Sequence, residues 1–268
     1  MKSLMWFRND LRMDDNPALR EACKSSDEVH AVYIYSQNQN QKHNEANCKT
    51  EFFIENLKVL ESKLSKINIP LIIKNSKGYE DNSDIICNYA KNHSIDKVFW
   101  NNQFGINESD RDEFVQSHLK SQNIEYENFD EQVVFTPGSI LTGEGKPYSV
   151  FTPFKRKWIE NFNLDLLDIE FKYIKKNATN IKSNIHEFDF QFIKNNQVDM
   201  SLWPAGESEA LLRLKMFLNE NILRYAQDRN DPITDGTSRL SAYLASGIIS
   251  PKRCILEALK INNFELDA

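Results

Sequence analysis

The stretch LMWFRNDLR occupies residues 4–12, close to the start of the chain. Its first four residues are apolar, which is typical of a strand buried on both faces of a parallel sheet. The charged residues Arg8, Asp10 and Arg12 follow at once, so they fall where such a strand would end. We interpret them as an ion-pair network at the strand end rather than as catalytic groups, because structural pairs of this kind are common.

Four further apolar runs follow along the first half of the chain, and amphipathic segments separate them. Strands that alternate with helices are typical of a doubly wound, mostly parallel sheet. We therefore predict a five-stranded α/β domain over residues 1–130, with ligands beyond the carboxyl ends of its strands. The expected strands are residues 4–7, 29–35, 70–74, 97–100 and 124–129, and the expected helices are residues 18–23, 52–67, 84–91 and 109–119.

Three local signals refine this prediction. Asn16 stands before Pro17, which is typical of a side-chain cap followed by proline at the first helical position. Residues 36–49 are polar and are expected to form a loop. No G-x-G-x-x-G motif follows the first strand, which argues against a conventional dinucleotide site.

The composition, with 40% hydrophobic and 11% aromatic residues, is that of a folded globular protein. The net charge of -6 does not favour general nucleic-acid binding, so contact with DNA would need a local basic face. The four cysteines are scattered without a C-x-x-C pair, so we expect reduced thiols and no metal site. Without a signal peptide or an apolar span, we expect a cytoplasmic monomer with no obligate protein partner and no membrane contact.

The pattern changes after residue 130. Residues 131–202 hold turn signals and a long, polar, weakly periodic stretch, which we interpret as an interdomain connector. Residues 203–268 place apolar residues at helical spacing and are expected to begin an all-α domain. A connector of this length would be unusual inside one compact domain, so the sequence favours two domains.

The stretch GTSRLSAYLASGIIS at residues 236–250 combines a turn with the start of a helix. Thr237 and Ser238 stand before its apolar run and can cap the helix. A helix N-terminus has unpaired N–H groups that can hold a phosphate, and the Arg239 guanidinium suits phosphate oxygens. An ordinary capped helix is the alternative interpretation.

Four stretches of the sequence resemble segments of the DNA photolyase/cryptochrome family. Residues 6–12 (WFRNDLR) resemble the family's opening, and residues 148–158 (YSVFTPFKRKW) resemble its Y-x-V-F-T-P-F-x-x-x-W segment. Residues 204–207 (PAGE) resemble its entry into the flavin domain, and residues 236–250 resemble its flavin-phosphate loop. The resemblance covers essentially the whole chain. It implies the amino-terminal part of a bacterial, folate-antenna photolyase, ending within the FAD domain.

The resemblance implies that residues 1–130 are an antenna domain and that FAD binds after residue 203. Arg229 is expected to approach the DNA backbone, although its residue type alone favours a salt bridge with a neighbouring aspartate. The implied FAD contacts are Tyr225, Thr237, Ser238, Arg239, Leu240 and Ser241.

A second part of the resemblance concerns the antenna chromophore. Residues 101–112 (NNQFGINESDRD) resemble the segment that holds 5,10-methenyltetrahydrofolate through Asn107 and Glu108, and His43 resembles a further residue of that site. A carboxylate and a carboxamide can hydrogen-bond the amide and amino edges of a pterin. In a compatible structural interpretation, Asn107 caps the following helix and the helix dipole stabilises Glu108. A deazaflavin is the alternative chromophore.

The activity implied by the resemblance is that of a deoxyribodipyrimidine photolyase, a carbon–carbon lyase. Such an enzyme uses light and FAD to repair cyclobutane pyrimidine dimers in damaged DNA. Because the cofactor carries the chemistry, no catalytic side chain is assigned here, and the chain alone is not expected to repair DNA. The alternatives are a cryptochrome-like photosensor and a folate-binding antenna module without repair activity.

Overall fold

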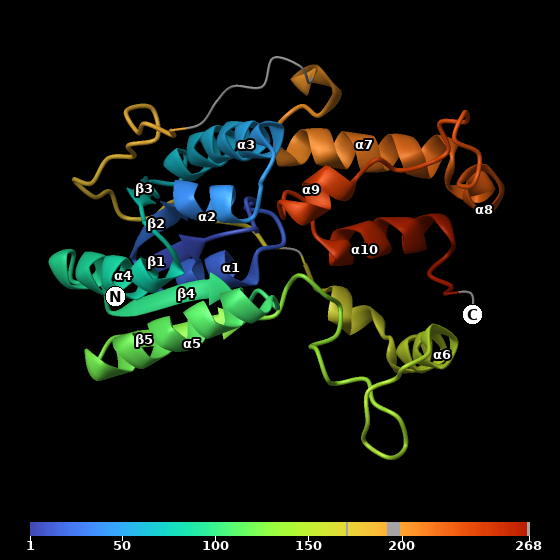
Figure 1. Ribbon diagram of the computed structural model, residues 1–268, viewed down its shortest axis with the longest axis horizontal. Coiled ribbons are helices and arrows are strands. Elements are labelled where there is room, and N and C mark those ends of the chain that lie inside the picture. The colour runs from blue at the N-terminus through green and yellow to red at the C-terminus, as the bar shows by residue number, and fades with distance from the viewer. Residues whose placement is uncertain (170, 192–198, 267–268) are drawn as a thin grey trace.

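A five-stranded, wholly parallel sheet forms the first half of the molecule in the computed structural model, which describes residues 1–169, 171–191 and 199–266. The sheet order is β3-β2-β1-β4-β5 (Figure 1). Because the chain builds outward from β1 to β3 and then returns to add β4, the order reverses between β1 and β4, where α/β sheets open a crevice. The five predicted strands are confirmed as β1 Lys2–Phe7, β2 Glu28–Tyr35, β3 Leu71–Asn75, β4 Lys97–Asn101 and β5 Glu125–Phe129.

Helices cover both faces of the sheet, as a doubly wound fold requires (Figure 1). Side chains alternate along β1, so Met5 and Phe7 join the apolar core on one face and Leu4 and Trp6 the core on the other. The first face is covered by α1 (Pro17–Ser25) and α3 (Asn47–Ser65), and the second by α4 (Asn82–Asn92) and α5 (Ile106–Ser121).

Two side chains cap the helices that follow the first two strands. The Asn16 cap is confirmed, since its side chain accepts a hydrogen bond from the Leu19 amide at 3.0 Å. The expected loop at residues 36–49 is wrong, because the Ser36 hydroxyl caps a short helix, α2 (Gln37–Lys42), and α3 begins at Asn47. A 3-10 turn, η1 (Tyr79–Asp81), precedes α4.

The described residues of the segment after β5 are largely irregular, and some of them bond to the edge of the sheet. Its regular elements are α6 (Phe151–Asn161), η2 (Leu164–Leu167) and η3 (Met200–Leu202). The side chain of Asn184 accepts from the Ile73 amide at 2.7 Å and donates to the Ile73 carbonyl at 3.1 Å, while the Ser183 hydroxyl accepts from the Leu71 amide at 3.0 Å. These bonds pair three backbone groups on the free edge of β3, which would otherwise invite pairing with another chain.

The last part of the chain is helical, as predicted, and lies beside the carboxyl end of the sheet (Figure 1). Leu214, Leu218 and Tyr243 from this part are buried in the same core as α1 and α3. In the described ranges, no helix is long and apolar enough to cross a membrane. The helices are α7 (Glu207–Glu220), η4 (Ile222–Arg224), α8 (Tyr225–Asp228), α9 (Ser241–Ala245) and α10 (Pro251–Ile261).

The covered edge of β3 gives a first prediction. Asn184→Ala should lower the free energy of unfolding by about 1–3 kcal/mol, because it leaves both backbone groups of Ile73 without these partners. Asn180→Ala, at an exposed position of the same segment, should change it by less than about 0.5 kcal/mol. Urea unfolding of both variants measures the difference, and equal values would contradict this role for Asn184.

Candidate functional site

The residues that follow β1 form a buried polar network. Asp10 accepts hydrogen bonds from the Arg8 amide and from the Asn101 side chain, both at 2.6 Å. The side-chain amide of Asn101 also donates to the side-chain oxygen of Asn16 at 2.8 Å. The Arg8 guanidinium pairs with the Asp112 carboxylate at 2.8 Å. The predicted ion-pair network at the strand end is therefore confirmed, and it ties β1 to β4 and to the start of α1.

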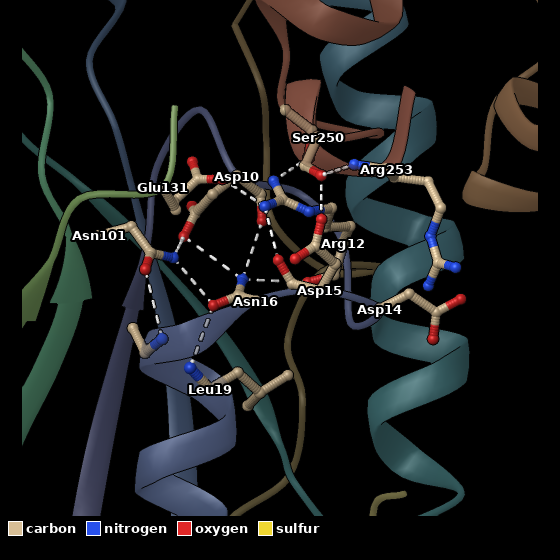
Figure 2. A network of polar contacts seen from close by, with 12 residues as sticks. Asp10, Arg12, Asp14, Asp15, Asn16, Leu19, Asn101, Glu131, Ser250 and Arg253 are labelled. Atoms are coloured by element: carbon tan, nitrogen blue, oxygen red, sulfur yellow. Dashed lines mark hydrogen bonds and ion pairs between the residues drawn. The ribbon is translucent and has the colours of Figure 1, made fainter. Parts of the chain in front are cut away.

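Arg12 is the centre of this network, with only 2% of its surface exposed. Figure 2 shows its guanidinium among Asp15, Glu131 and Ser250. It pairs with Glu131 and donates to the carbonyl oxygens of Asp15 at 2.7 Å and Gly247 at 3.0 Å. Burial opposes its charge, but the carboxylates of Glu131 and Asp15 prevail and raise the pKa of Arg12. Arg12 thereby joins the strand end to both later parts of the chain.

The backbone around Gly247 lies directly against the loop after β1. Gly247 has a φ of 63°, and a Cβ atom there would overlap the carbonyl oxygen of Asn9. The Ser246 carbonyl accepts from the Leu11 amide at 3.4 Å, and the Ser250 hydroxyl bonds Asp15. Only glycine can occupy this position without moving one of the two segments.

Glu207 anchors the start of α7 to the same loop. Its buried carboxylate accepts from the backbone amides of Met13 and Asp14 and pairs with Lys63 of α3. The neighbouring Gly206 amide donates to the Asn56 side chain at 2.8 Å. The PAGE stretch therefore fastens the helical part to the α/β part.

A polar cavity of about 280 Å³ opens at the carboxyl end of the sheet. Strand residues such as Trp6 and Tyr35 line it, as do residues of α2, α3 and α5. This is the expected place for a ligand in a doubly wound fold. Five residues of its wall each carry a buried polar atom without a hydrogen-bond partner in the described part of the chain. They are Trp6 (Nε1), Arg8 (Nε), Gln39 (Oε1), Ser76 (Oγ) and Asn82 (Oδ1).

These five atoms include both hydrogen-bond donors and acceptors. The indole and guanidinium nitrogens donate, the two amide oxygens accept, and the hydroxyl can do either. Buried polar atoms are normally paired, so such a group around one cavity points to a polar ligand there. A heterocycle with amide and amino edges has the matching mixture of groups.

Two of the three predicted folate residues lie at this cavity. His43, at the C-terminal end of α2, and Glu108, in the first turn of α5, both line it. Asn107 is exposed and does not line the cavity. The proposed cap by Asn107 is wrong, because Gly105 occupies the N-cap position and the helix begins at Ile106. Glu108 does lie in the first turn, where the helix dipole favours a carboxylate.

The sequence interpretation found His43 after β2 but missed four other cavity residues on the segments after β2 and β3. Gln39 follows β2, while Ser76, Tyr79 and Asn82 follow β3. Each is a polar residue that follows the carboxyl end of a strand within seven positions, and this placement could have marked it as a cavity residue. Arg111 of α5 was also missed. Its guanidinium lies 5.0 Å from the Trp6 ring and 4.9 Å from the Tyr79 ring.

Three of the six predicted FAD contacts line a hollow of about 220 Å³ beside α7, whereas Tyr225, Leu240 and Ser241 do not line it. Thr237, Ser238 and Arg239 line it, and their neighbour Leu240 is buried. The expected hydroxyl cap is wrong, because Leu240 occupies the N-cap position of α9 and makes no side-chain hydrogen bond there. Since α9 has only five residues, it offers little helix dipole.

Side chains of this loop remain available for a ligand. Within the described ranges, the hydroxyls of Thr237, Ser238 and Ser241 make no hydrogen bond to protein, and Ser241 is exposed. Arg239, at a φ of 50°, pairs with Asp235 at 2.9 Å. Tyr225 packs edge-on against Phe217 at 5.7 Å and is 38% exposed.

Arg229 lies against Tyr225 rather than in an ion pair. Its guanidinium is 5.6 Å from the Tyr225 ring, and no ion pair of Arg229 occurs among the residues that the structure describes. Arg224 faces Asp228 instead, at 3.6 Å. The expected salt bridge of Arg229 is therefore wrong, and its charge is free to meet a phosphate.

No group of three or more His, Cys, Asp or Glu residues in the described part of the chain could hold a metal ion. The four cysteines are free thiols.

Comparison with known proteins places these features in context. Residues 3–172 match the family model for DNA photolyase. The deoxyribodipyrimidine photo-lyases of Salmonella typhimurium and Escherichia coli are 33% and 32% identical to this chain over 94% of its length. The chain spans only 53% of either relative, which is about half their length.

Solved structures show the same relation. The class III photolyase of Agrobacterium tumefaciens superposes with a TM-score of 0.80 at 25% identity, covering 100% of this chain and 54% of its own. A Synechocystis cryptochrome also gives 0.80, at 21% identity, covering 100% of this chain and 57% of its own, and it supports the fold alone.

The buried ion pair of Arg12 gives a second prediction. Arg12→Met should lower the free energy of unfolding by about 3–5 kcal/mol, because Glu131 would remain buried without its partner. Lys24→Met removes an exposed pair with Glu21 and should cost at most about 1 kcal/mol. Chemical denaturation compares the two. A loss for Arg12→Met no larger than for Lys24→Met would show that the network does not fasten the parts together.

A third prediction concerns pH. Burial raises the pKa of Asp15 to about 7, against the lowering effect of Arg12. Between about pH 4 and 7 the folded state therefore holds a proton that the unfolded state has lost, so Asp15 lowers stability as pH rises through this window. Burial also raises the pKa of Glu131 and Glu207, which adds to the same slope.

Asp15→Asn should therefore flatten the fall in unfolding free energy between pH 4 and 7 by up to about 1.4 kcal/mol per pH unit. Asparagine tolerates the left-handed backbone at this position, where φ is 56°. Denaturation across this pH range is the measurement, with Asp110→Asn at an exposed carboxylate as the control. An unchanged slope in Asp15→Asn would contradict the assignment.

Proposed function

Because the chain belongs to the DNA photolyase family, we propose that it forms the antenna half and the first FAD contacts of a deoxyribodipyrimidine photolyase. Such a lyase uses light and FAD to split cyclobutane pyrimidine dimers in damaged DNA. One observation carries the proposal. A cavity at the carboxyl end of the sheet is lined by five residues that each carry an unpartnered buried polar atom, and by His43 and Glu108.

The cavity is the proposed antenna site, with 5,10-methenyltetrahydrofolate as its ligand. Its volume of about 280 Å³ is at the low end for ligand pockets, so it suits the ring system of a folate rather than the whole molecule. Glu108 can accept from the amino edge of a pterin, while Gln39 and Asn82 offer further acceptors. Asn107, which is exposed next to Glu108 and does not line the cavity, is proposed to contact the part of the ligand outside it.

The hollow beside α7 is the proposed FAD site, of which this chain supplies one wall. The free hydroxyls of Thr237, Ser238 and Ser241 and the guanidinium of Arg239 suit phosphate oxygens. Tyr225 and the backbone of Leu240 complete the proposed set. FAD, when bound, supplies the electron that splits the dimer. Arg229 is proposed to meet the DNA backbone, because it has no carboxylate partner among the described residues.

We further propose three parts for the chain: an antenna domain over residues 1–130, a connector over residues 131–202, and the beginning of the FAD domain over residues 203–268. The bonds between the connector and β3 support its role as a fixed part of the antenna domain's edge. A cytoplasmic monomer that acts on DNA is the proposed setting.

Binding measured by absorption tests the proposal. The purified chain is mixed separately with 5,10-methenyltetrahydrofolate and FAD, passed through a desalting column, and its spectrum is recorded. We expect the folate band to stay with the protein. Glu108→Gln should weaken folate binding about 10- to 100-fold, because it removes a charge-assisted hydrogen bond. Glu113→Gln, an exposed carboxylate on the same helix, is the control.

The outcomes separate the alternatives. Retained folate without flavin supports an antenna module, whereas retained flavin with light-dependent loss of thymine dimers supports a self-sufficient repair enzyme. We expect no repair by residues 1–268 alone, since the FAD contacts in this chain form one open wall. A chain that retains neither chromophore would contradict the proposed function.

A further inference from the structure

Glu108 is held in place by a residue outside the predicted site. Its Oε1 atom accepts a hydrogen bond from the Tyr79 hydroxyl at 2.8 Å. Tyr79 belongs to the turn after β3, whereas Glu108 belongs to the first turn of α5, so the bond joins two elements. Both residues line the cavity at the end of the sheet.

Gly105 provides the space for this arrangement. A Cβ atom at this position would overlap Oε2 of Glu108, so the carboxylate leans back over the glycine. Gly105 has a φ of -67°, which any residue can adopt, so the space and not the backbone is what favours glycine here. One oxygen of Glu108 is thus fixed by Tyr79, and the other occupies the room that Gly105 leaves.

Tyr79 is suited to act as a permanent donor. Its ring lies 4.9 Å from the Arg111 guanidinium, which itself donates to the Gln103 side chain at 2.9 Å. Burial, together with the bond to Glu108, raises the pKa of Tyr79 to about 12. The phenol therefore keeps its proton at every pH at which the protein would work.

The Glu108 carboxylate needs the hydrogen bond from Tyr79 because Glu108 lies at the boundary between two hollows. Glu108 lines the inner cavity, and it also lines a larger hollow of about 670 Å³ that reaches α9 and α10. Asn9 and Gln103 share this position. A freely rotating carboxylate at the boundary could serve either space, so its direction determines which ligand edge it can meet.

We propose that Tyr79 is a positioning residue that holds the Glu108 carboxylate in the orientation required by the chromophore in the inner cavity, with Gly105 leaving the necessary room. This inference rests on the proposed antenna function. It adds a residue that acts through Glu108 and not by its own contact with the ligand.

A double-mutant cycle tests the proposal. Tyr79→Phe keeps the ring and its contact with Arg111 but removes the hydroxyl. We expect it to weaken binding of 5,10-methenyltetrahydrofolate about 3- to 10-fold, the value of one hydrogen bond. In a Glu108→Ala background it should cause no further loss. Tyr126→Phe removes a hydroxyl that bonds Gln116 at 3.4 Å away from the cavity, and it should bind like the parent chain.

Crystal structures of the ligand-free variants give a second, independent readout. In Tyr79→Phe and in Gly105→Ala, the Glu108 side chain should leave its place over residue 105. The proposal is overturned if Glu108 keeps its rotamer in Tyr79→Phe, or if the loss of affinity is equal with and without Glu108. A parent chain that does not bind folate would sink the proposed function, while the rotamer of Glu108 would still decide whether Tyr79 positions it.

Discussion

The buried guanidinium of Arg12 is the interaction on which the arrangement of this protein depends. A charge removed from water is costly unless it is paired and fully hydrogen-bonded. Arg12 is paired with Glu131 and donates to the carbonyl oxygens of Asp15 and Gly247, although its Nε atom has no hydrogen-bond partner among the described residues. These groups come from the end of the sheet, the segment after β5 and the helical part. The contacts of the Arg12 side chain therefore fix how three distant stretches of the sequence meet.

That constraint also explains where ligands can bind. The loop after β1 is held by a hydrogen bond from Asn101 of β4 to its own Asp10 and by bonds from its Met13 and Asp14 amides to Glu207 of α7, which fix it at the carboxyl end of the sheet. Rigid scaffolds with polar residues on their loops are the usual setting for ligand sites. Five residues with unpartnered polar atoms line the cavity there, whereas Thr237, Ser238 and Arg239 line a separate hollow beside α7.

The sequence predicted the sheet well because periodicity and apolar runs report burial directly. The run at residues 4–7 needed no tertiary information to be recognised as a central strand. The Ser36 cap and the short α2 were missed, because a polar six-residue helix buries no side chain and so leaves no periodic signal. The cap expected of Thr237 and Ser238 was wrong since turn geometry, not residue type, decided where α9 begins. The position of Tyr79 after β3 could mark it as a cavity residue but not as a partner of Glu108, because that role depends on a contact with a residue 29 positions away.

The central claim is that the cavity at the carboxyl end of the sheet receives the ring of a folate-type chromophore. The most direct measurement is a crystal structure of the chain soaked with 5,10-methenyltetrahydrofolate. The account predicts ring density within hydrogen-bond distance of Glu108 and of at least one of the unpartnered atoms of Gln39, Ser76 and Asn82. An empty cavity, or a folate bound only at the surface of another element, would contradict it.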